Sequence, residues 1–233
     1  MSEVAGGRRE LRKAQTRVDI RTAAQTLFSQ RGFDGVTSAD VAAAAGVAVQ
    51  TVFNHFGSKE DLFFDGRTPW VEGLADAVTL RPAGTDPLRA LREYLTADIE
   101  GLHDQDAREQ NRSYLEVLSS SPALQSRERS LVDVAAQRLA DALLEAIPAG
   151  SYAAESRRAD PVKARVLSQL AAHLFLVGGR VLVLEHRRAV LDPELGEEAR
   201  RSVRETTTAA LTMLEDSLRS LARQQLGAPG TSA

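Results

Sequence analysis

The sequence of 233 residues has no cysteine, which excludes disulfide bridges, thiolate zinc sites and cysteine nucleophiles. It also has no apolar run long enough for a membrane span. The longest, residues 170–184, is interrupted by His173 and Arg180 and falls short of the roughly 20 residues needed. Residues 1–15 carry charges with no apolar segment behind them, so they do not form a secretory signal. We therefore expect a cytoplasmic protein that does not contact a membrane.

Features typical of an enzyme are missing as well. The chain has no glycine-rich phosphate loop, and its four histidines lie too far apart in sequence to suggest a metal-binding pair. Acidic residues are plentiful but scattered along expected solvent-exposed helix faces, so no general acid and base can be nominated. We expect a protein that is not an enzyme and that needs no metal and no cofactor.

Charge is distributed unevenly along the chain. The net charge is −3, yet residues 1–33 hold seven basic residues against three acidic ones. No Lys, Arg, Asp or Glu occurs between Val41 and Ser58. A local basic surface on an acidic protein suits the binding of a polyanion through one face. An ordinary solvated helix explains the same basic count equally well.

The apolar residues recur at helical spacing along nearly the whole chain, and no segment alternates as a strand does. We therefore predict an all-α fold. A first helix ends at Gly32. A second starts at Thr37, whose hydroxyl can pair with Asp40 in a capping box, and ends at Gly46. A third helix is predicted over about residues 48–56.

The rest of the chain continues this pattern. A fourth helix begins at Ser58, capped with Asp61, and Pro69 interrupts or kinks it. Proline and glycine then separate further helices, predicted over residues 88–102, 114–118, 122–147, 161–190 and 203–221. We expect an exposed loop at residues 151–160 and a disordered tail from about residue 227.

The third helix has two distinct faces. Its apolar residues share one side, which we predict to be buried: Val49, Val52, Phe53 and Phe56. Its polar residues share the other side: Gln50, Thr51, Asn54 and His55. A helix that is buried on one side and offers short hydrogen-bonding side chains on the other meets the needs of a helix-turn-helix in the major groove. Gln and Asn can pair bidentately with adenine, whereas Thr and His more often reach phosphates or a thymine methyl.

The run from Phe28 to Phe63, FSQRGFDGVTSADVAAAAGVAVQTVFNHFGSKEDLF, closely resembles the DNA-binding domain of the tetracycline-repressor (TetR) family of bacterial transcriptional regulators. The matched elements are the approach G-F-x-x-x-T, the turn A-x-x-A-G-V, the recognition helix T-V-F-N-H-F and the helix start S-K-E-x-L. The resemblance covers about the first quarter of the chain. It implies a three-helix DNA-binding domain with a basic N-terminal arm over residues 1–65, and a helical effector-binding and dimerisation domain over residues 66–233.

The resemblance also implies which residues contact DNA. Those near phosphates would be Thr37, Ser38, Thr51, Phe53, His55 and Lys59. Gln50 and Asn54 would lie near bases, and Val49, in the same helix, is counted with the DNA-binding residues. Two positions depart from the family pattern. Phe53 stands where members usually have Tyr, and Ala48 stands where they often have Ser or Thr, so the third helix lacks a cap that typically contributes ~1 kcal/mol.

Family members dimerise through their last two long helices. In this chain residues 174–184 are apolar on nearly every face, and the pair Gly178-Gly179 would allow another helix to approach closely. The helix must therefore be covered on both sides, either within one subunit or by a second copy. We expect a dimer whose interface includes Leu174, Gly178, Gly179, Leu182, Leu211, Leu214 and Leu218.

Family members also hold a small molecule between the middle helices of the larger domain. Polar and aromatic residues on those helices are candidates for effector contacts, although each also suits an ordinary surface or core position. The candidates are Trp70, Tyr94, His103, Asn111, Arg112, Tyr114 and His173. Because the surrounding helices are rich in apolar residues, we expect a largely hydrophobic effector.

Together, these features predict a ligand-responsive transcriptional regulator that acts as a repressor. It would bind a near-palindromic operator in double-stranded DNA as a homodimer, and a small effector would release it. The alternative is a helical protein-binding adaptor that keeps the helix-turn-helix shape without reading DNA. Replacing Gln50 and Asn54 together by Ala distinguishes the two, since only a DNA reader would lose sequence preference.

Overall fold

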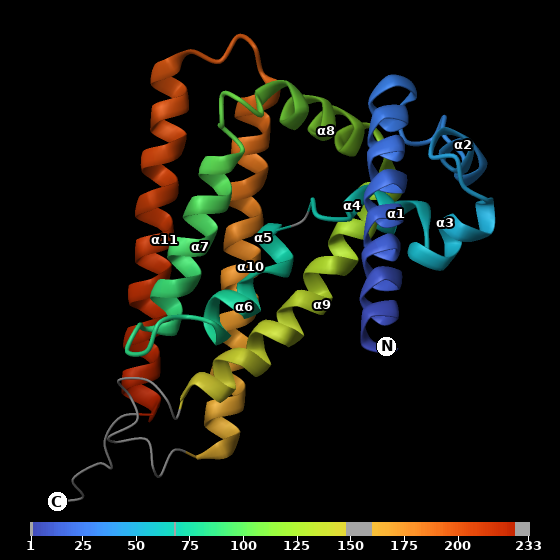
Figure 1. Cartoon of the computed structure of the whole chain (residues 1–233). Coiled ribbons are helices and arrows are strands. Elements are labelled where there is room, and N and C mark those ends of the chain that lie inside the picture. Colours follow the sequence, from blue (N-terminus) through green and yellow to red (C-terminus); the bar gives the residue numbers. More distant parts are fainter. Residues whose placement is uncertain (1, 68, 148–159, 227–233) are drawn as a thin grey trace, which may run out of the picture. The chain divides into compact units, whose positions relative to one another are not determined.

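The computed structural model describes residues 2–67, 69–147 and 160–226, and within these ranges every regular element is a helix (Figure 1). This confirms the all-α prediction. The tail from residue 227 and residues 151–159 of the expected loop lie outside the described residues. Asp160, the end of that loop, is exposed and caps the next helix by accepting from the Val162 N–H at 2.8 Å.

The chain divides into two compact units. The first unit comprises residues 1–68 and 112–128, and the second unit comprises residues 69–111 and 129–233. The first division therefore falls close to the boundary that we predicted after residue 65. The inclusion of residues 112–128 in the first unit was not predicted.

The first unit is built on four helices near the N-terminus. They are α1 (Ser2–Arg31), α2 (Ser38–Ala44), α3 (Val49–His55) and α4 (Lys59–Phe64). Aromatic rings form the centre of its core, where the centroids of Phe28, Phe33 and Phe63 lie 5.2 to 5.9 Å apart. Tyr114 stacks on Phe63 with a centroid distance of 4.8 Å and donates to the Arg67 carbonyl. These contacts explain why residues after 112 belong to this unit.

Local sequence signals define the ends of these helices as predicted. Thr37 and Asp40 form a complete capping box before α2. Gly46 ends the following turn with a φ of +67°, a conformation that costs glycine little. Ser58 accepts from the Asp61 N–H at the start of α4. Ala48 precedes α3 without any side-chain cap, as expected.

The second unit is a bundle in which α7 (Pro87–Gly101), α10 (Pro161–Leu191) and α11 (Glu197–Leu226) pack together (Figure 1). The short helices α5 (Pro69–Glu72) and α6 (Leu74–Thr79) pack on α7. Two further helices, α8 (Arg108–Ser120) and α9 (Pro122–Ala146), contribute residues to both units. Pro69 begins a separate helix. The predicted fourth helix already ends at Phe64, before the turn at Gly66, so Pro69 starts a new helix and does not kink the old one.

Two glycines in the second unit let neighbouring segments approach each other closely. Gly179 on α10 faces Leu95 of α7, so closely that a Cβ added at Gly179 would lie 2.8 Å from the leucine side chain. Gly73 likewise lies beneath the Tyr94 hydroxyl. By length and composition alone α10 could cross a membrane. Core helices of soluble proteins also pass that test, and one side of α10 is buried here through Phe175 and Leu176.

Candidate nucleic-acid interface

Helix α3 exposes more of its surface than its pattern predicted. Val52 and Phe56 are buried, but Val49 is 41% exposed and Phe53 is 49% exposed. The prediction that all four apolar residues are buried was therefore wrong. Because α3 has only seven residues, it packs against the rest of its unit along one edge. That contact buries Val52 and Phe56 and leaves Val49 and Phe53 exposed.

The outer edge of α3 carries the residues that we predicted to read bases. Gln50 and Asn54 are exposed, and the Gln50 side-chain amide donates to the Asn54 side-chain oxygen at 3.2 Å. This bond holds the two amides together one helical turn apart and leaves the Gln50 oxygen free to accept. Thr51 and His55 are half-buried at the flanks of the same edge.

The residues that we expected to contact phosphates near α3 differ in how exposed they are and in which hydrogen bonds they already make. Thr37 is exposed, but its hydroxyl is bonded to Asp40 within the capping box, and Ser38 is half-buried. The side-chain and backbone hydrogen bonds from Thr37 lower the pKa of Asp40, so this carboxylate stays ionised and keeps the box intact.

Lys59 takes a position that its charge did not suggest. Its ammonium group donates to the carbonyls of Phe33 and Val36 at 2.9 and 2.8 Å, and lies 4.1 Å from the centroid of the Phe33 ring. Lys59 therefore ties the start of α4 to the loop between α1 and α2. One of its three N–H groups is left for a phosphate.

Arg17 of α1 was not among the predicted site residues. Its guanidinium donates to the carbonyl of His55 at 2.7 Å, at the last residue of α3, and lies 4.3 Å over the ring of Phe56. It also forms an ion pair with Asp65, to which Arg21 adds a longer contact at 3.5 Å. The end of α3 is thus held by a cation from another helix. The four-residue spacing of basic residues along α1 was a sequence signal that could have pointed to Arg17.

The predicted effector residues do not gather at one place. Arg112 and Tyr114 belong to the first unit, where Arg112 pairs with Glu116 and Tyr114 packs on Phe63. His173 lies exposed on α10. The assignment of these three residues to an effector pocket therefore stays a prediction, because a helical pattern does not show which side chains point to a common core.

The remaining effector candidates lie in the second unit. Trp70 is buried, and its indole N–H has no hydrogen-bond partner among the described residues. Tyr94 is half-buried, and burial raises the pKa of its hydroxyl. Asn111 donates to the carbonyls of Gly101 and Leu102 and closes the loop after α7.

A chain of hydrogen bonds links His103 to two residues that the sequence did not single out. The Nε2 atom of His103 lies 2.7 Å from Nδ1 of His186, and Nε2 of His186 lies 2.8 Å from the Thr207 hydroxyl. Burial lowers the pKa of His186 to about 4 and also lowers that of His103, so both rings are neutral near pH 7. Among the described residues no group of three or more acidic or histidine side chains could hold a metal ion.

The predicted dimer residues separate into two groups. Leu174 is exposed, and Gly178, Leu182 and Leu214 are partly covered. Gly179, Leu211 and Leu218 are buried in the core of their own subunit, so their place at a dimer interface stays a prediction. Periodicity did not separate them because α10 and α11 are apolar on more than one side.

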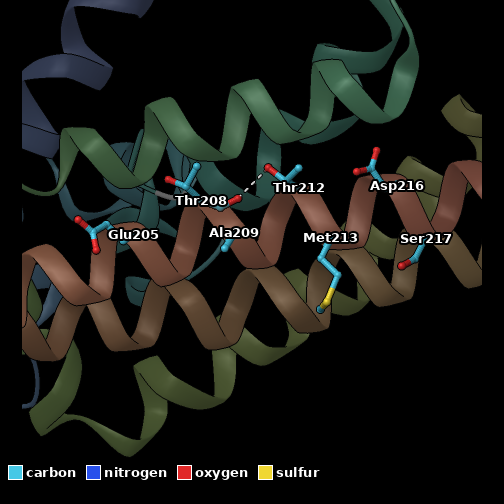
Figure 2. A pocket seen from close by; sticks show the side chains of 7 residues that line it. All are labelled: Glu205, Thr208, Ala209, Thr212, Met213, Asp216 and Ser217. Carbon is cyan, nitrogen blue, oxygen red and sulfur yellow. Dashed lines mark hydrogen bonds between the residues drawn. The ribbon is translucent and has the colours of Figure 1, made fainter.

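An exposed surface nevertheless runs along α10 and α11. On α10 it is a stripe of large apolar side chains, namely Val166, Leu170, Leu174, Val177 and Val181. On α11 a shallow, open groove is lined by small and polar residues with one methionine, namely Glu205, Thr208, Ala209, Thr212, Met213, Asp216 and Ser217 (Figure 2). Sequence reasoning named only Leu174 among all of these.

Comparison with known proteins shows which family the first unit resembles in sequence. Residues 20–65 match the sequence model of the family described as bacterial regulatory proteins, tetR family. The chain is 33% identical over 98 residues to the transcriptional regulator TcmR of Streptomyces glaucescens, a match covering 42% of this chain and 43% of TcmR. It is 35% identical over 81 residues to the transcriptional repressor DhaR of Mycobacterium sp. strain GP1, covering 34% and 41%. The chain thus spans less than half the length of these curated relatives.

Solved structures match over most of the chain. A putative transcriptional regulator from Pseudomonas aeruginosa PAO1 superimposes with a TM-score of 0.53 at 20% identity, over 91% of this chain and 94% of that one. NalD, the secondary repressor of the MexAB-OprM efflux pump in Pseudomonas aeruginosa, gives a TM-score of 0.52 at 21% identity, over 86% and 96%. At these identities the likeness establishes the fold.

Proposed function

We propose that this chain, whose residues 20–65 match the sequence model of the bacterial tetR family of regulatory proteins, is a transcriptional regulator that binds operator DNA. The observation that carries the proposal is the exposed edge of α3, where Gln50 and Asn54 point outward and no side chain has a formal charge. Exposed helices of soluble proteins usually carry charged residues. Paired amides suit the adenine edge in the major groove.

The remaining DNA contacts are assigned to residues of α3 and to residues at the starts of α2 and α4. Gln50 and Asn54 read bases. The neighbours that contact phosphates, sugars or thymine methyl groups are Ser38, Val49, Thr51, Phe53 and His55. Thr37 contributes through its capping box, which orients α2, and Lys59 contributes through the one N–H that the Phe33 and Val36 carbonyls leave free.

We further propose a homodimer formed through α10 and α11. Five large apolar side chains in one exposed stripe are unusual on a monomer and typical of an interaction surface. Met213 is 67% exposed beside Thr212 in the adjoining groove on α11, and small residues there would let a second pair of helices approach (Figure 2). A twofold dimer presents two α3 helices to two half-sites.

The dimer is tested by charge substitution in the stripe. Val177→Glu with Val181→Glu should convert the dimer to a monomer in analytical ultracentrifugation, because the new carboxylates would be buried at the interface. Val134→Glu is the matched control, since Val134 is similarly exposed at 53% but lies on α9. An unchanged sedimentation coefficient for the double variant would contradict the proposed interface.

The effector site is proposed around Trp70 in the second unit. A buried N–H without a partner is costly, so a ligand that supplies an acceptor there gains affinity. A separate apolar pocket of the same unit, between α7, α9, α10 and α11, has a volume of about 60 Å³. This is well below the roughly 300 Å³ of typical ligand sites, so an effector must select a more open conformation. One solved structure that is similar to this chain, with a TM-score of 0.51 at 22% identity over 84% of this chain and 91% of that one, is a complex of SmeT with triclosan.

Because Trp70 is the sole tryptophan, its fluorescence reports on the effector directly. An effector with an acceptor for the indole should change the emission over the same concentration range in which it releases the operator. Trp70→Phe should weaken that release. If release proceeds with unchanged emission, the site lies elsewhere.

The relative DhaR is named a repressor, which supports repression as the biological role, and we propose the cytoplasm as its location. The test is selection of bound fragments from random double-stranded DNA by the full chain, followed by anisotropy titration at several salt concentrations. Enrichment of an inverted repeat whose affinity falls steeply with salt is the expected result. Failure to enrich any sequence would contradict the proposal and favour the protein-binding adaptor.

A further inference from the structure

The two apolar side chains that α3 leaves exposed form one continuous surface. Val49 and Phe53 lie one helical turn apart, which places their Cβ atoms about 5 to 6 Å from each other. A single exposed apolar residue is ordinary on a soluble protein. Two neighbouring ones on a helix of seven residues, which we call the apolar flank of α3, indicate a contact partner with an apolar group of its own.

The apolar flank lies between the packed edge of α3 and its amide edge. At 3.6 residues per turn, the middle of the flank lies about 80° around the helix axis from the buried Val52. In the other direction it lies about 100° from the middle of the pair Gln50 and Asn54. A major groove that receives the two exposed amides therefore also brings the apolar flank against one of its walls.

The chemistry of the apolar flank restricts what it can contact in DNA. Neither Val49 nor Phe53 carries a side-chain donor or acceptor, so neither can hydrogen-bond to a phosphate or to a base edge. The apolar group that a base displays in the major groove is the C5 methyl of thymine, and apolar side chains contact it. An A·T pair presents this methyl together with the adenine N6 and N7 atoms that suit an amide. The same or neighbouring A·T pairs can therefore satisfy both the amides and the apolar flank.

We propose that Val49 and Phe53 pack against thymine C5 methyl groups in the major groove, so that the choice of operator depends on those methyls. The inference rests on the proposed function and adds which bases the apolar flank selects. Side chains about 5 to 6 Å apart span roughly two base-pair steps of about 3.4 Å, so each half-site contains about one or two thymines read by the flank. The partner is DNA and not a protein surface, because the flank is continuous with the paired amides of Gln50 and Asn54.

Replacement of thymine by deoxyuridine tests the inference, because deoxyuridine keeps the base pair and the O4 acceptor and removes only the methyl. Each thymine of the selected operator is replaced in turn, and the affinity of the full chain is measured by anisotropy titration. At the thymines read by the flank, the wild type should lose about fourfold in affinity for each methyl, as expected for the burial of one such carbon group. Replacements outside the inverted repeat should have no effect.

A variant without the apolar flank should lose this sensitivity. Val49→Ala with Phe53→Ala should bind the operator and its deoxyuridine form with nearly equal affinity. The matched control is Leu80→Ala with Val134→Ala, which shortens two exposed apolar side chains of the second unit and should keep the wild-type loss. Because all four side chains are exposed, both variants should keep the fold, and thermal unfolding checks this.

Three results would overturn the inference. They are a selected half-site without thymine, a wild type that is insensitive to deoxyuridine throughout the half-site, and an α3 variant that is as sensitive as the control. The first two concern the wild type alone, so they do not depend on how the variants fold. A wild type that enriches no sequence would instead overturn the proposed function, so the two failures are distinguishable.

Discussion

The guanidinium of Arg17 donates to the backbone carbonyl of His55 and lies 4.3 Å over the ring of Phe56, so that one side chain of α1 closes the C-terminal end of α3. The last carbonyls of a helix have no partner within the helix, and a cation there is favourable. The orientation of the exposed amides on α3 thus depends on a residue 38 positions away.

Arg17→Ala should destabilise the first unit and weaken operator binding. Loss of the partly exposed hydrogen bond and the cation–π contact should cost about 1 kcal/mol of unfolding free energy. Urea denaturation of the DNA-free protein measures this cost, and Arg138→Ala on α9 is the control, because Arg138 is exposed. A variant as stable as the control would show that Arg17 does not hold α3.

Lys59→Met should lower the stability of the protein without DNA. The substitution keeps the length of the side chain but removes two hydrogen bonds to carbonyls that hold the loop after α1, at a cost of about 1 to 3 kcal/mol. Thermal unfolding with and without operator separates its two roles. An unchanged melting temperature of the DNA-free protein, with weakened operator binding, would mean that Lys59 acts as a phosphate clamp alone.

Ala48→Ser should stabilise the protein. Ala48 precedes α3 in the extended conformation of an N-cap, with φ −70° and ψ 148°, and offers no side-chain acceptor. A serine hydroxyl there can accept from the free amides of the first turn, which typically contributes about 1 kcal/mol. Ala43→Ser, at an exposed position within α2, is the control and should be neutral or slightly destabilising. Equal effects of the two substitutions would contradict the capping argument.

The second unit contains a half-buried carboxyl group, Asp98, and a buried imidazole, His186, whose titrations affect stability in opposite directions. Burial raises the pKa of Asp98 to about 6, and the charge of Arg187 offsets part of this rise. Burial, together with smaller contributions from His103 and Arg204, lowers the pKa of His186 to about 4. The ordinary values are 3.8 and 6.5. The stability contributed by Asp98 is therefore lost as the pH rises from about 4 through 6, and that contributed by His186 is lost as the pH falls from about 6.5 through 4.

Single substitutions should expose these opposing effects in melting temperatures recorded between about pH 4.5 and pH 7.5. Relative to the wild type, Asp98→Asn should become more stable as the pH rises, because only the wild type must ionise a half-buried carboxyl group. His186→Asn should become less stable relative to the wild type over the same range. Curves for the three proteins that run parallel would contradict both assignments.

Much of the fold could be predicted because its signals are local. The capping box at Thr37, the cap at Ser58 and the proline at the start of α10 all depend on residues within a few positions of one another. The chemistry of α3 could be predicted for the same reason, since one helical turn brings Gln50 to Asn54.

The predictions that were wrong concern contacts between distant segments. The sequence marks Val49 and Phe53 as apolar, but it does not show that α3 packs along one edge only. The position of Lys59 over Phe33 joins residues 26 positions apart, and that of His186 beside His103 joins residues 83 positions apart. Such pairings depend on how whole helices pack, which spacing within one helix does not encode.

The central claim is that Gln50 and Asn54 read bases, and anisotropy titration tests it most directly by comparing the selected operator with a scrambled duplex. For Gln50→Ala with Asn54→Ala, the preference for the operator should fall by at least tenfold, since each bidentate pair contributes about 1 to 3 kcal/mol of discrimination. Gln137→Ala with Asp141→Ala removes an exposed amide contact of the same i, i+4 spacing on α9 and should leave the preference unchanged. An undiminished preference in the α3 variant would contradict the account.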